Sequence, residues 1–444
     1  MKLKPHKSHW LAAVLSLGLS CTTFAASDTR SLADVVREAL LTNPDVAEAR
    51  NQWLARREEV KQAEGGLLPT LDLNAGIGYE YTDSPSTRAI GGDNELERRE
   101  LGLSLRQMLF DGWGTQNEVN RQIARTNSAA ARLLSVGESV AMRAAEAYVD
   151  LQRNQELTAI ADESLETHKR IENQIRLRSE AGVGRRADYN QVQSRVALAT
   201  VNMIAAETNL LDARAAYQRV VGTLPGTKYA PFSVDKGTLP ESVHRALEIA
   251  RANNPVLQIA AADIDAAQAQ HEAAKQFHYP RVDLEIGGNR NNDITGSQGH
   301  VEDLSAMLRM RYNLFRGGSD DARERVTAHN INEARDIRDR SDRQLEESIR
   351  LAWAAFAATS TQLPLLEQQV VAARATREAY TRQFKIGQRS LLDLLNSENE
   401  VLQARQAVVN SRADRLLAQY RILEAMGTLV DHFGAASVVA SKQQ

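Results

Sequence analysis

One glycine-centred segment occurs twice in this 444-residue chain, and its repetition limits the possible folds more than any other feature. Gly182 and Asp188 in the first copy recur as Gly387 and Asp393 in the second, 205 positions later in both cases. Each copy interrupts a long stretch with helical periodicity. Because glycine readily adopts the left-handed conformation that ends a helix, each copy predicts the tip of a long helical hairpin. We therefore expect an internal duplication.

Alternating sequence precedes each predicted hairpin. From Leu71 to Tyr81, apolar residues occupy every odd position, and polar residues or glycine occupy every even one. Such strict alternation is typical of a strand with one apolar face. Comparable patterns predict strands at about 70–82 and 100–110 in the first half, and at about 281–290 and 302–315 in the second.

The two halves are joined by a segment rich in proline and glycine. Asn43-Pro44 recurs 211 positions later as Asn254-Pro255, whereas the hairpin tips recur after 205. The difference falls in the loop between the strands, where changes in length are tolerated. We expect a first repeat over residues 26–222 with its tip at about 182–188, a connector over 223–240, a second repeat over 241–430 with its tip at about 387–393, and a C-terminal tail over 431–444.

The N-terminus has the features of a secretory signal peptide over residues 1–25. Three lysines among the first seven residues precede an apolar stretch from Trp10 to Leu19, and small residues favour cleavage after Ala25. Cys21, the only cysteine, is an alternative lipidation site, although Gly18 stands where a lipoprotein signal favours leucine. Cleavage after Ala25 leaves a mature chain without thiols or disulfides.

Composition and motifs exclude several classes of function. The formal net charge of −3, without long basic runs, argues against a nucleic-acid-binding protein. The nine histidines are scattered, so we expect no metal site. No P-loop, nucleophile elbow or dinucleotide fingerprint occurs. We therefore expect neither an enzyme nor a bound cofactor.

The predicted strands fit a membrane barrel better than a soluble sheet. Each has large apolar residues on one face and polar residues such as Asp72 on the other, the pattern of a barrel between lipid and an aqueous lumen. Four strands cannot close alone, so several chains are required. A soluble sandwich is the alternative. The residues expected to face lipid are Leu71, Leu73, Ile77, Leu101, Leu103, Leu105, Val282, Leu284 and Leu308.

The predicted helices are much longer than a globular core requires. The segment from Thr115 to Ala181 would extend roughly 100 Å at 1.5 Å per residue. Its return helix, Asp188 to Val221, is about half as long, so the helix from Asp45 to Glu64 has room to stack above it. Both halves repeat this arrangement, which predicts a hollow helical cylinder continuing from the barrel.

These features resemble the TolC-like outer-membrane channels of Gram-negative bacteria across essentially the whole mature chain. The resemblance implies an α+β membrane protein in which long helical hairpins form a periplasmic α-barrel continuous with a transmembrane β-barrel. Each protomer of a homotrimer would contribute four strands. The residues that carry the resemblance are the two tips, Asn43-Pro44, Asn254-Pro255, Leu109-Phe110-Asp111-Gly112 and Leu314-Phe315-Arg316-Gly317.

The resemblance also implies a function and partners. The segment from Gly387 to Asn396 looks most like the branch that serves type I secretion. The chain would then be a passive outer-membrane duct for unfolded protein, extending into the periplasm and joined to a periplasmic adaptor and an inner-membrane ABC transporter. A drug-efflux duct serving a proton-driven pump is an alternative with the same architecture. A periplasmic helical adaptor or scaffold is an alternative of another class.

In the family that this chain resembles, the hairpin tips form the periplasmic aperture. Asp393, Asn396 and Arg389 match positions that line or latch it. Many relatives have two aspartates where this chain has Asp393 and Asn396, so only one carboxylate ring is expected and strong blockage by divalent cations is in doubt. Phe384 lacks the hydroxyl with which a tyrosine would bond Asp188.

The tip glycines have two interpretations. Gly182 and Gly387 match glycines that contact adaptor hairpins in relatives, but glycines that merely end helices would look the same. The charged residues near the tips could likewise be solvated side chains without a role in gating.

Overall fold

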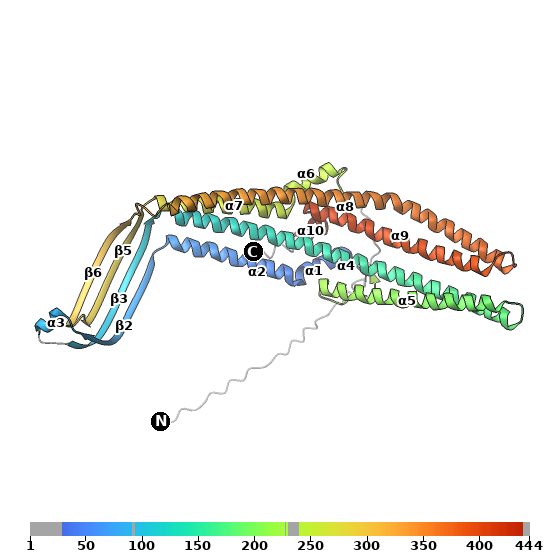
Figure 1. Cartoon of the computed structure of the whole chain (residues 1–444), viewed down its shortest axis with the longest axis horizontal. Coiled ribbons are helices and arrows are strands. Elements are labelled where there is room, and N and C mark those ends of the chain that lie inside the picture. The colour runs from blue at the N-terminus through green and yellow to red at the C-terminus, as the bar shows by residue number, and fades with distance from the viewer. Residues whose placement is uncertain (1–28, 91–93, 227, 230–238, 438–444) are drawn as a thin grey trace, which may run out of the picture.

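The computed structural model describes residues 29–90, 94–226, 228–229 and 239–437. The predicted signal peptide with Cys21, most of the connector and the last residues of the tail lie outside the described residues. The molecule is elongated, with a bent-away sheet at one end and two helical hairpin tips at the other (Figure 1).

The sheet has four antiparallel strands in the order β2-β3-β5-β6. Their bounds are β2 (Thr70–Thr82), β3 (Asn94–Phe110), β5 (Arg281–Ile294) and β6 (Ser297–Arg311). β3 begins about six residues before the predicted start, because its first residues pair with the end of β2. β6 ends before the predicted position 315, where the Asn313 side chain accepts a hydrogen bond from the Phe315 N–H at 3.1 Å.

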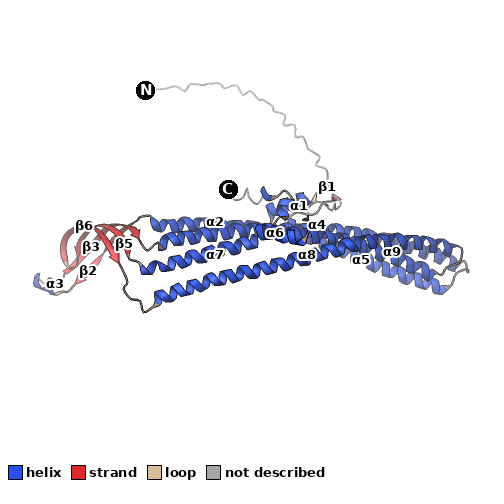
Figure 2. Ribbon diagram, turned by 90° about the horizontal axis from the view of Figure 1, so that it is seen from above, coloured by secondary structure: helices blue, strands red, loops and turns tan. Residues whose placement is uncertain are grey.

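Two long helical hairpins extend away from the sheet (Figure 2). The outgoing helices α4 (Gly114–Glu180) and α8 (Ser319–Lys385) have 67 residues each. The return helices α5 (Arg186–Val221) and α9 (Leu391–Met426) have 36 residues each. At 1.5 Å per residue, each outgoing helix is roughly 100 Å long.

Shorter helices complete the wall near the sheet. α2 (Pro44–Glu64) packs along α4, while α7 (Pro255–Ala274) packs against both α4 and α8. α2 and α5 therefore lie one after the other beside α4, as their lengths predict (Figure 1). The 3₁₀ turns η1 (Gly65–Leu67) and η2 (Lys275–His278) lead from α2 and α7 to the sheet.

Small elements surround the bundle at mid-height, and one caps the sheet. The helices at mid-height are α1 (Leu32–Thr42), α6 (Val243–Asn253) and α10 (Leu429–His432). β1 (Thr29–Arg30) pairs in parallel with β4 (Lys228–Tyr229). α3 (Pro85–Ile90) lies at the far end of the sheet (Figure 1). Among the described helices, none combines the length and apolarity needed to cross a membrane.

The repeated Asn-Pro pair joins consecutive helices and ties them to a return helix. Each asparagine caps the helix that its proline begins, and proline suits the first turn because its missing N–H would have no partner there. The Asn43 side-chain amide donates to the Val220 carbonyl at 3.1 Å. Asn254 donates in the same way to Ala425 at 2.8 Å.

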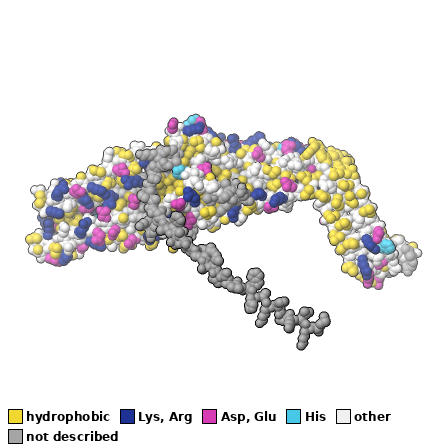
Figure 3. Space-filling model, turned by 180° about the vertical axis from the view of Figure 1, so that it is seen from behind, with side chains coloured by type: hydrophobic (Ala, Val, Ile, Leu, Met, Phe, Trp, Pro, Cys, Tyr) yellow, Lys and Arg dark blue, Asp and Glu magenta, His cyan; other side chains and the backbone are white. Residues whose placement is uncertain are grey.

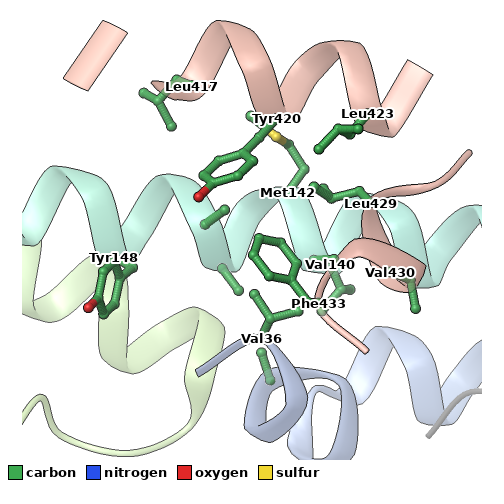
Figure 4. Packing of buried hydrophobic residues seen from close by; sticks show 14 of the residues in the cluster. Val36, Val140, Met142, Tyr148, Leu417, Tyr420, Leu423, Leu429, Val430 and Phe433 are labelled. Carbon is green, nitrogen blue, oxygen red and sulfur yellow. The ribbon is translucent and has the colours of Figure 1, made fainter. Parts of the chain in front are cut away.

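The main hydrophobic core lies at mid-height (Figure 4). Side chains from α4, α9 and α1 meet there, and the α10 segment closes one side with Leu429, Val430 and Phe433. Glu138 is buried beside this core, where its carboxylate accepts hydrogen bonds from the backbone N–H groups of Leu429 at 3.0 Å and Val430 at 3.3 Å.

Candidate functional site

The sheet exposes a broad apolar face. Ile77 is 82% exposed, although it is a large apolar residue in the middle of a strand. Leu73 lies opposite Leu103, and Leu284 lies opposite Leu308, so these side chains share one face of the sheet. Apolar side chains dominate this arm in the space-filling view, and charged ones gather at its far end (Figure 3). An apolar patch of this extent marks an interaction surface.

Six of the nine residues predicted to face lipid are exposed in the single chain, and three are partly covered by neighbours. The exposed residues are Leu71, Leu73, Ile77, Leu101, Leu103 and Leu308, and the partly covered ones are Leu105, Val282 and Leu284.

Charged residues occupy the opposite face of the sheet, near the helices. Asp283 is fully buried beneath three arginines that lie within hydrogen-bonding distance of its carboxylate. Arg106 approaches it to 3.0 Å, and Arg311 approaches it to 3.2 Å. Glu285 and Arg309 add a 2.8 Å pair beside it. An apolar face opposite a charged face is the pattern of a wall between lipid and water.

At the other end of the molecule, both hairpins turn at a glycine in the left-handed conformation. Gly182 has a φ of +73° and Gly387 a φ of +78°, values that side chains with a Cβ rarely adopt. A Cβ added at either glycine would meet no atom within 4 Å. Both tips are therefore open to the approach of another chain. Ser390 caps α9 by accepting a hydrogen bond from the Asp393 N–H at 3.1 Å.

Arg389 is held by side chains of its own hairpin. Its Nε donates to the Gln383 side chain at 2.9 Å, and its guanidinium lies 4.3 Å from the centroid of the Tyr380 ring. A third contact, to Asp393, is 3.7 Å long. The structure therefore brings together Arg389, in the turn before the Ser390 cap, and Asp393, in the first turn of α9.

Two of the other predicted aperture residues contact the opposite hairpin, and the third forms no ion pair within the described part of the chain. The Arg178 guanidinium lies 5.3 Å from the centroid of the Phe384 ring, a cation–π contact between α4 and α8. Arg195 on α5 approaches the Asn396 amide oxygen at 3.5 Å. Asp188 lies in the first turn of α5, and its carboxylate has no ion-pair partner among the described residues.

Sequence reasoning did not identify Arg178 and Arg195. Each faces a residue about 200 positions away in the chain, and no spacing rule within one helix specifies such a pair. A small apolar cluster just above the tips holds the hairpins together and makes these contacts possible. It consists of Ile171, Ile175, Val192, Leu391, Leu394 and Leu395.

No group of histidine, cysteine, aspartate or glutamate residues suitable for a metal ion occurs in the part of the chain that the structure describes. The candidate functional surfaces are the apolar face of the sheet, the charged face of the sheet, and the open tips of the two long hairpins.

The family model for "outer membrane efflux protein" matches residues 35–223 and 246–428, and the chain belongs to this family. It is an outer-membrane protein that extends into the periplasm, and its class is that of channels rather than enzymes.

Two curated relatives illustrate the range of the family. The chain is 24% identical over 420 residues to the outer membrane efflux protein BepC of Brucella suis, covering 94% of this chain and 90% of BepC. It is also 24% identical over 430 residues to the alkaline protease secretion protein AprF of Pseudomonas aeruginosa, covering 95% of this chain and 88% of AprF.

A solved structure shares the fold. The Campylobacter jejuni CmeC outer membrane channel superposes with a TM-score of 0.78 at 16% sequence identity, covering 89% of this chain and 85% of CmeC. The expected combination of helical hairpins with a small sheet is thus confirmed.

Proposed function

We propose that this chain is the outer-membrane duct of a type I secretion system, passing unfolded protein across the periplasm and outer membrane. One observation carries the proposal: a sheet with an apolar outer face continues directly into helical hairpins about 100 Å long that end in open tips. Such a wall spans two compartments, and in this proposal an energised partner drives transport through it.

The duct requires several copies of the chain. The four-stranded sheet has two free edges, β2 and β6, and four strands are too few to close a barrel. We propose a homotrimer with a twelve-stranded barrel, in which the matched helix lengths of the two hairpins reflect an internal duplication. The partners would be a periplasmic adaptor that docks at the tips and an inner-membrane ABC transporter.

Two observations favour secretion over drug efflux. The tip segment from Gly387 to Asn396 resembles the type I secretion branch, and the relative AprF is named for alkaline protease secretion. BepC is named an efflux protein, so a duct for a proton-driven drug pump is the second candidate.

Deletion of the gene distinguishes a secretion duct from a drug-efflux duct. A secretion duct predicts loss of an exported protein from the culture medium, restored by the intact gene, with little change in antibiotic sensitivity. Increased antibiotic sensitivity with unchanged export would favour the efflux duct. If the detergent-extracted outer-membrane protein migrates as a heat-modifiable oligomer, the scaffold alternative is excluded.

Substituting Gly387 with tryptophan should abolish export while oligomers still form. The side chain would occupy the open space at the tip and block close approach of an adaptor, and the positive φ would add local strain. Exported protein in the medium and oligomer yield in the membrane are the two measurements.

Gly299 provides a matched control for this substitution. It also has a positive φ, +108°, and open space around it, but it lies in β6, within the sheet. Gly299→Trp should leave export intact. Normal export by the Gly387→Trp protein would show that adaptor contact does not involve this tip.

Substituting Arg389 with serine should raise single-channel conductance in planar bilayers. Arg389 tethers Gln383, Tyr380 and Asp393, and its loss should loosen the tip of the α8–α9 hairpin. Each contact is exposed and worth at most about 1 kcal/mol, so the gate would remain easy to open. Asp393→Ala should instead weaken cation selectivity, because it removes a carboxylate ring.

Arg382 lies in the last turn of α8 with no ion-pair partner among the described residues, so Arg382→Ser is the control and should conduct like the parent. Wild-type conductance from Arg389→Ser would place the latch elsewhere, with the Arg178–Phe384 contact as the next candidate.

A further inference from the structure

Four arginines stand together on the charged face of the sheet, at the end where the strands meet the helices. Arg106 comes from β3, Arg281 from β5, and Arg309 and Arg311 from β6. The strand register places Arg281 directly opposite Arg311, and Arg309 directly opposite Asp283. Because cross-strand partners point to the same side of a sheet, these side chains share one face. The four arginines are called the arginine cluster below.

The two carboxylates within the arginine cluster lie beneath the guanidinium groups. The side chain of Asp283 is 0% exposed, and that of Glu285, which lies opposite Arg106, is 30% exposed. The four arginine side chains are 43–53% exposed. Solvent on this face therefore meets guanidinium groups before it meets the carboxylates that hold them.

Most of the hydrogen-bonding capacity of the arginine cluster is unused. Arg106 and Arg311 each donate to Asp283 through Nη2, at 3.0 Å and 3.2 Å. Arg281 donates to the same carboxylate through Nε, and Arg309 donates to Glu285 through Nε at 2.8 Å. Each guanidinium has five N–H groups, and among the described residues these bonds engage one nitrogen of each arginine. The remaining donors can bind a further carboxylate, whose two oxygens match the planar guanidinium fork.

The balance of charge changes along this face of the sheet. At the far end, Arg98 lies between Glu80 and Glu100 and pairs with both, so carboxylates outnumber arginines there. Near the helices, four arginines stand against three carboxylates when the exposed Asp72 of β2 is included, and one of those three is fully buried. Small residues separate the two regions, namely Asn74, Gly76, Gly102, Ser104, Gly287 and Ser305.

A purely structural role accounts for three of the arginines. A buried carboxylate without partners is costly, and Arg106, Arg281 and Arg311 supply the partners of Asp283. Arg309 instead donates to Glu285, which is partly exposed. The loss of Arg309 therefore reduces the exposed positive charge without removing a partner of the buried carboxylate.

We propose that the arginine cluster is a binding site for the carboxylate groups of the exported polypeptide as it passes from the helical wall into the barrel. The inference rests on the proposed duct, in which the charged face lines the lumen, and it adds the chemistry of the substrate: segments rich in aspartate and glutamate are held there. Half-exposed guanidinium groups bind weakly, which suits a duct that must release what it carries.

Block of the ion current by polyglutamate tests the site. Purified full-length protein in planar bilayers should show current interruptions when a short polyglutamate peptide is added on the barrel side. Arg309→Gln should weaken this block by at least about threefold, because one exposed charge pair is lost in every copy. Arg309→Lys keeps the charge without the planar fork and should give an intermediate block. The yield of heat-modifiable oligomer is measured for each variant, and Arg309→Lys is the test variant if Arg309→Gln assembles poorly.

Arg290→Gln is the matched control. Arg290 is also an exposed arginine of β5 with a glutamate partner, Glu302 at 3.2 Å, but it lies opposite Leu101 on the other face of the sheet. Its loss should leave the polyglutamate block unchanged. Polylysine is the peptide control, and its effect should not weaken in the Arg309→Gln protein.

The remaining outcomes separate the site from the duct. Equal polyglutamate block of the parent and Arg309→Gln proteins overturns the site and leaves the proposed duct standing. Equal block by monomeric glutamate, at the same concentration of carboxylate, shows binding of small anions only and overturns the assignment to a polypeptide. A parent protein that forms no channel overturns the proposed duct, and this is measured before any peptide is added.

Discussion

Substituting Leu103 with arginine should sharply reduce the recovery of oligomer from the outer membrane. Leu103 lies in the middle of β3 on the exposed apolar face, opposite Leu73 on one side and Gly288 on the other. An arginine near the middle of a bilayer costs about 2–4 kcal/mol on the lipid face of a barrel. The cost recurs in every copy of the assembly. Heat-modifiable oligomer in detergent extracts measures the effect.

The adjacent residue, Ser104, supplies the control. Its side chain points to the opposite face of β3, where Asp72 lies directly across from it. Ser104→Arg adds the same side chain on the side proposed to face the lumen, and it should assemble normally. Equal oligomer yields from the Leu103 and Ser104 variants would contradict the assignment of the apolar face to lipid.

The buried Glu138 should make the protein less stable as the pH rises from about 5 to 8. Burial raises the pKa of Glu138 from 4.5 to about 7. Between these two values the folded chain retains a proton that the unfolded chain releases, so the free energy of unfolding falls with increasing pH. At about 1.4 kcal/mol per pH unit, the difference amounts to about 3 kcal/mol per chain.

Substituting Glu138 with glutamine removes this titration and keeps an oxygen to accept a bond from α10. The variant should have a higher melting temperature than the parent at pH 8 and a flatter dependence between pH 5 and 8. Thermal unfolding of the detergent-solubilised oligomer at a fixed heating rate measures both. Glu207→Gln, on the exposed surface of α5, should retain the parent's dependence. An unchanged slope for Glu138→Gln would show that this carboxyl is not the titrating group.

Other carboxyl groups also contribute to the pH dependence of stability. Burial, with the nearby charge of Glu146, also raises the pKa of Glu424 to about 7, so part of the slope persists in the Glu138 variant. Hydrogen bonding to Arg251 lowers the pKa of Asp342. The stabilisation from that pair is present at neutral pH and is lost only as the pH falls below about 4, in a separate window.

Helices and strands could be located from the sequence because their signals are local. Helical periodicity, the glycines at the hairpin tips and the alternation of the strands can each be recognised within a short segment of sequence. The early part of β3 was missed because residues 94–99 are mostly charged and do not alternate. Those residues form a strand because they pair with β2 and because Arg98 binds Glu80 across the two strands.

Contacts between the hairpins could not be predicted in this way. Arg178 meets Phe384, and Arg195 meets Asn396, only because the apolar cluster above the tips fixes how the two hairpins lie together. The same holds for Glu138, whose partners Leu429 and Val430 follow it by nearly 300 residues. Each residue type was visible in the sequence, but its partner depends on the packing of distant segments.

The order of strands in the sheet has a consequence for how the chain folds as it is synthesised. Each helical hairpin closes between neighbouring segments, so it can form as soon as its own residues are available. The sheet cannot, because β3 ends at Phe110 and its partner β5 begins only at Arg281. Until then, β2 and β3 form an isolated two-stranded ribbon, which is marginally stable in water. The newly made chain therefore passes through a long interval in which its first helical hairpin is complete and its first two strands, with their apolar face, still lack the rest of the sheet.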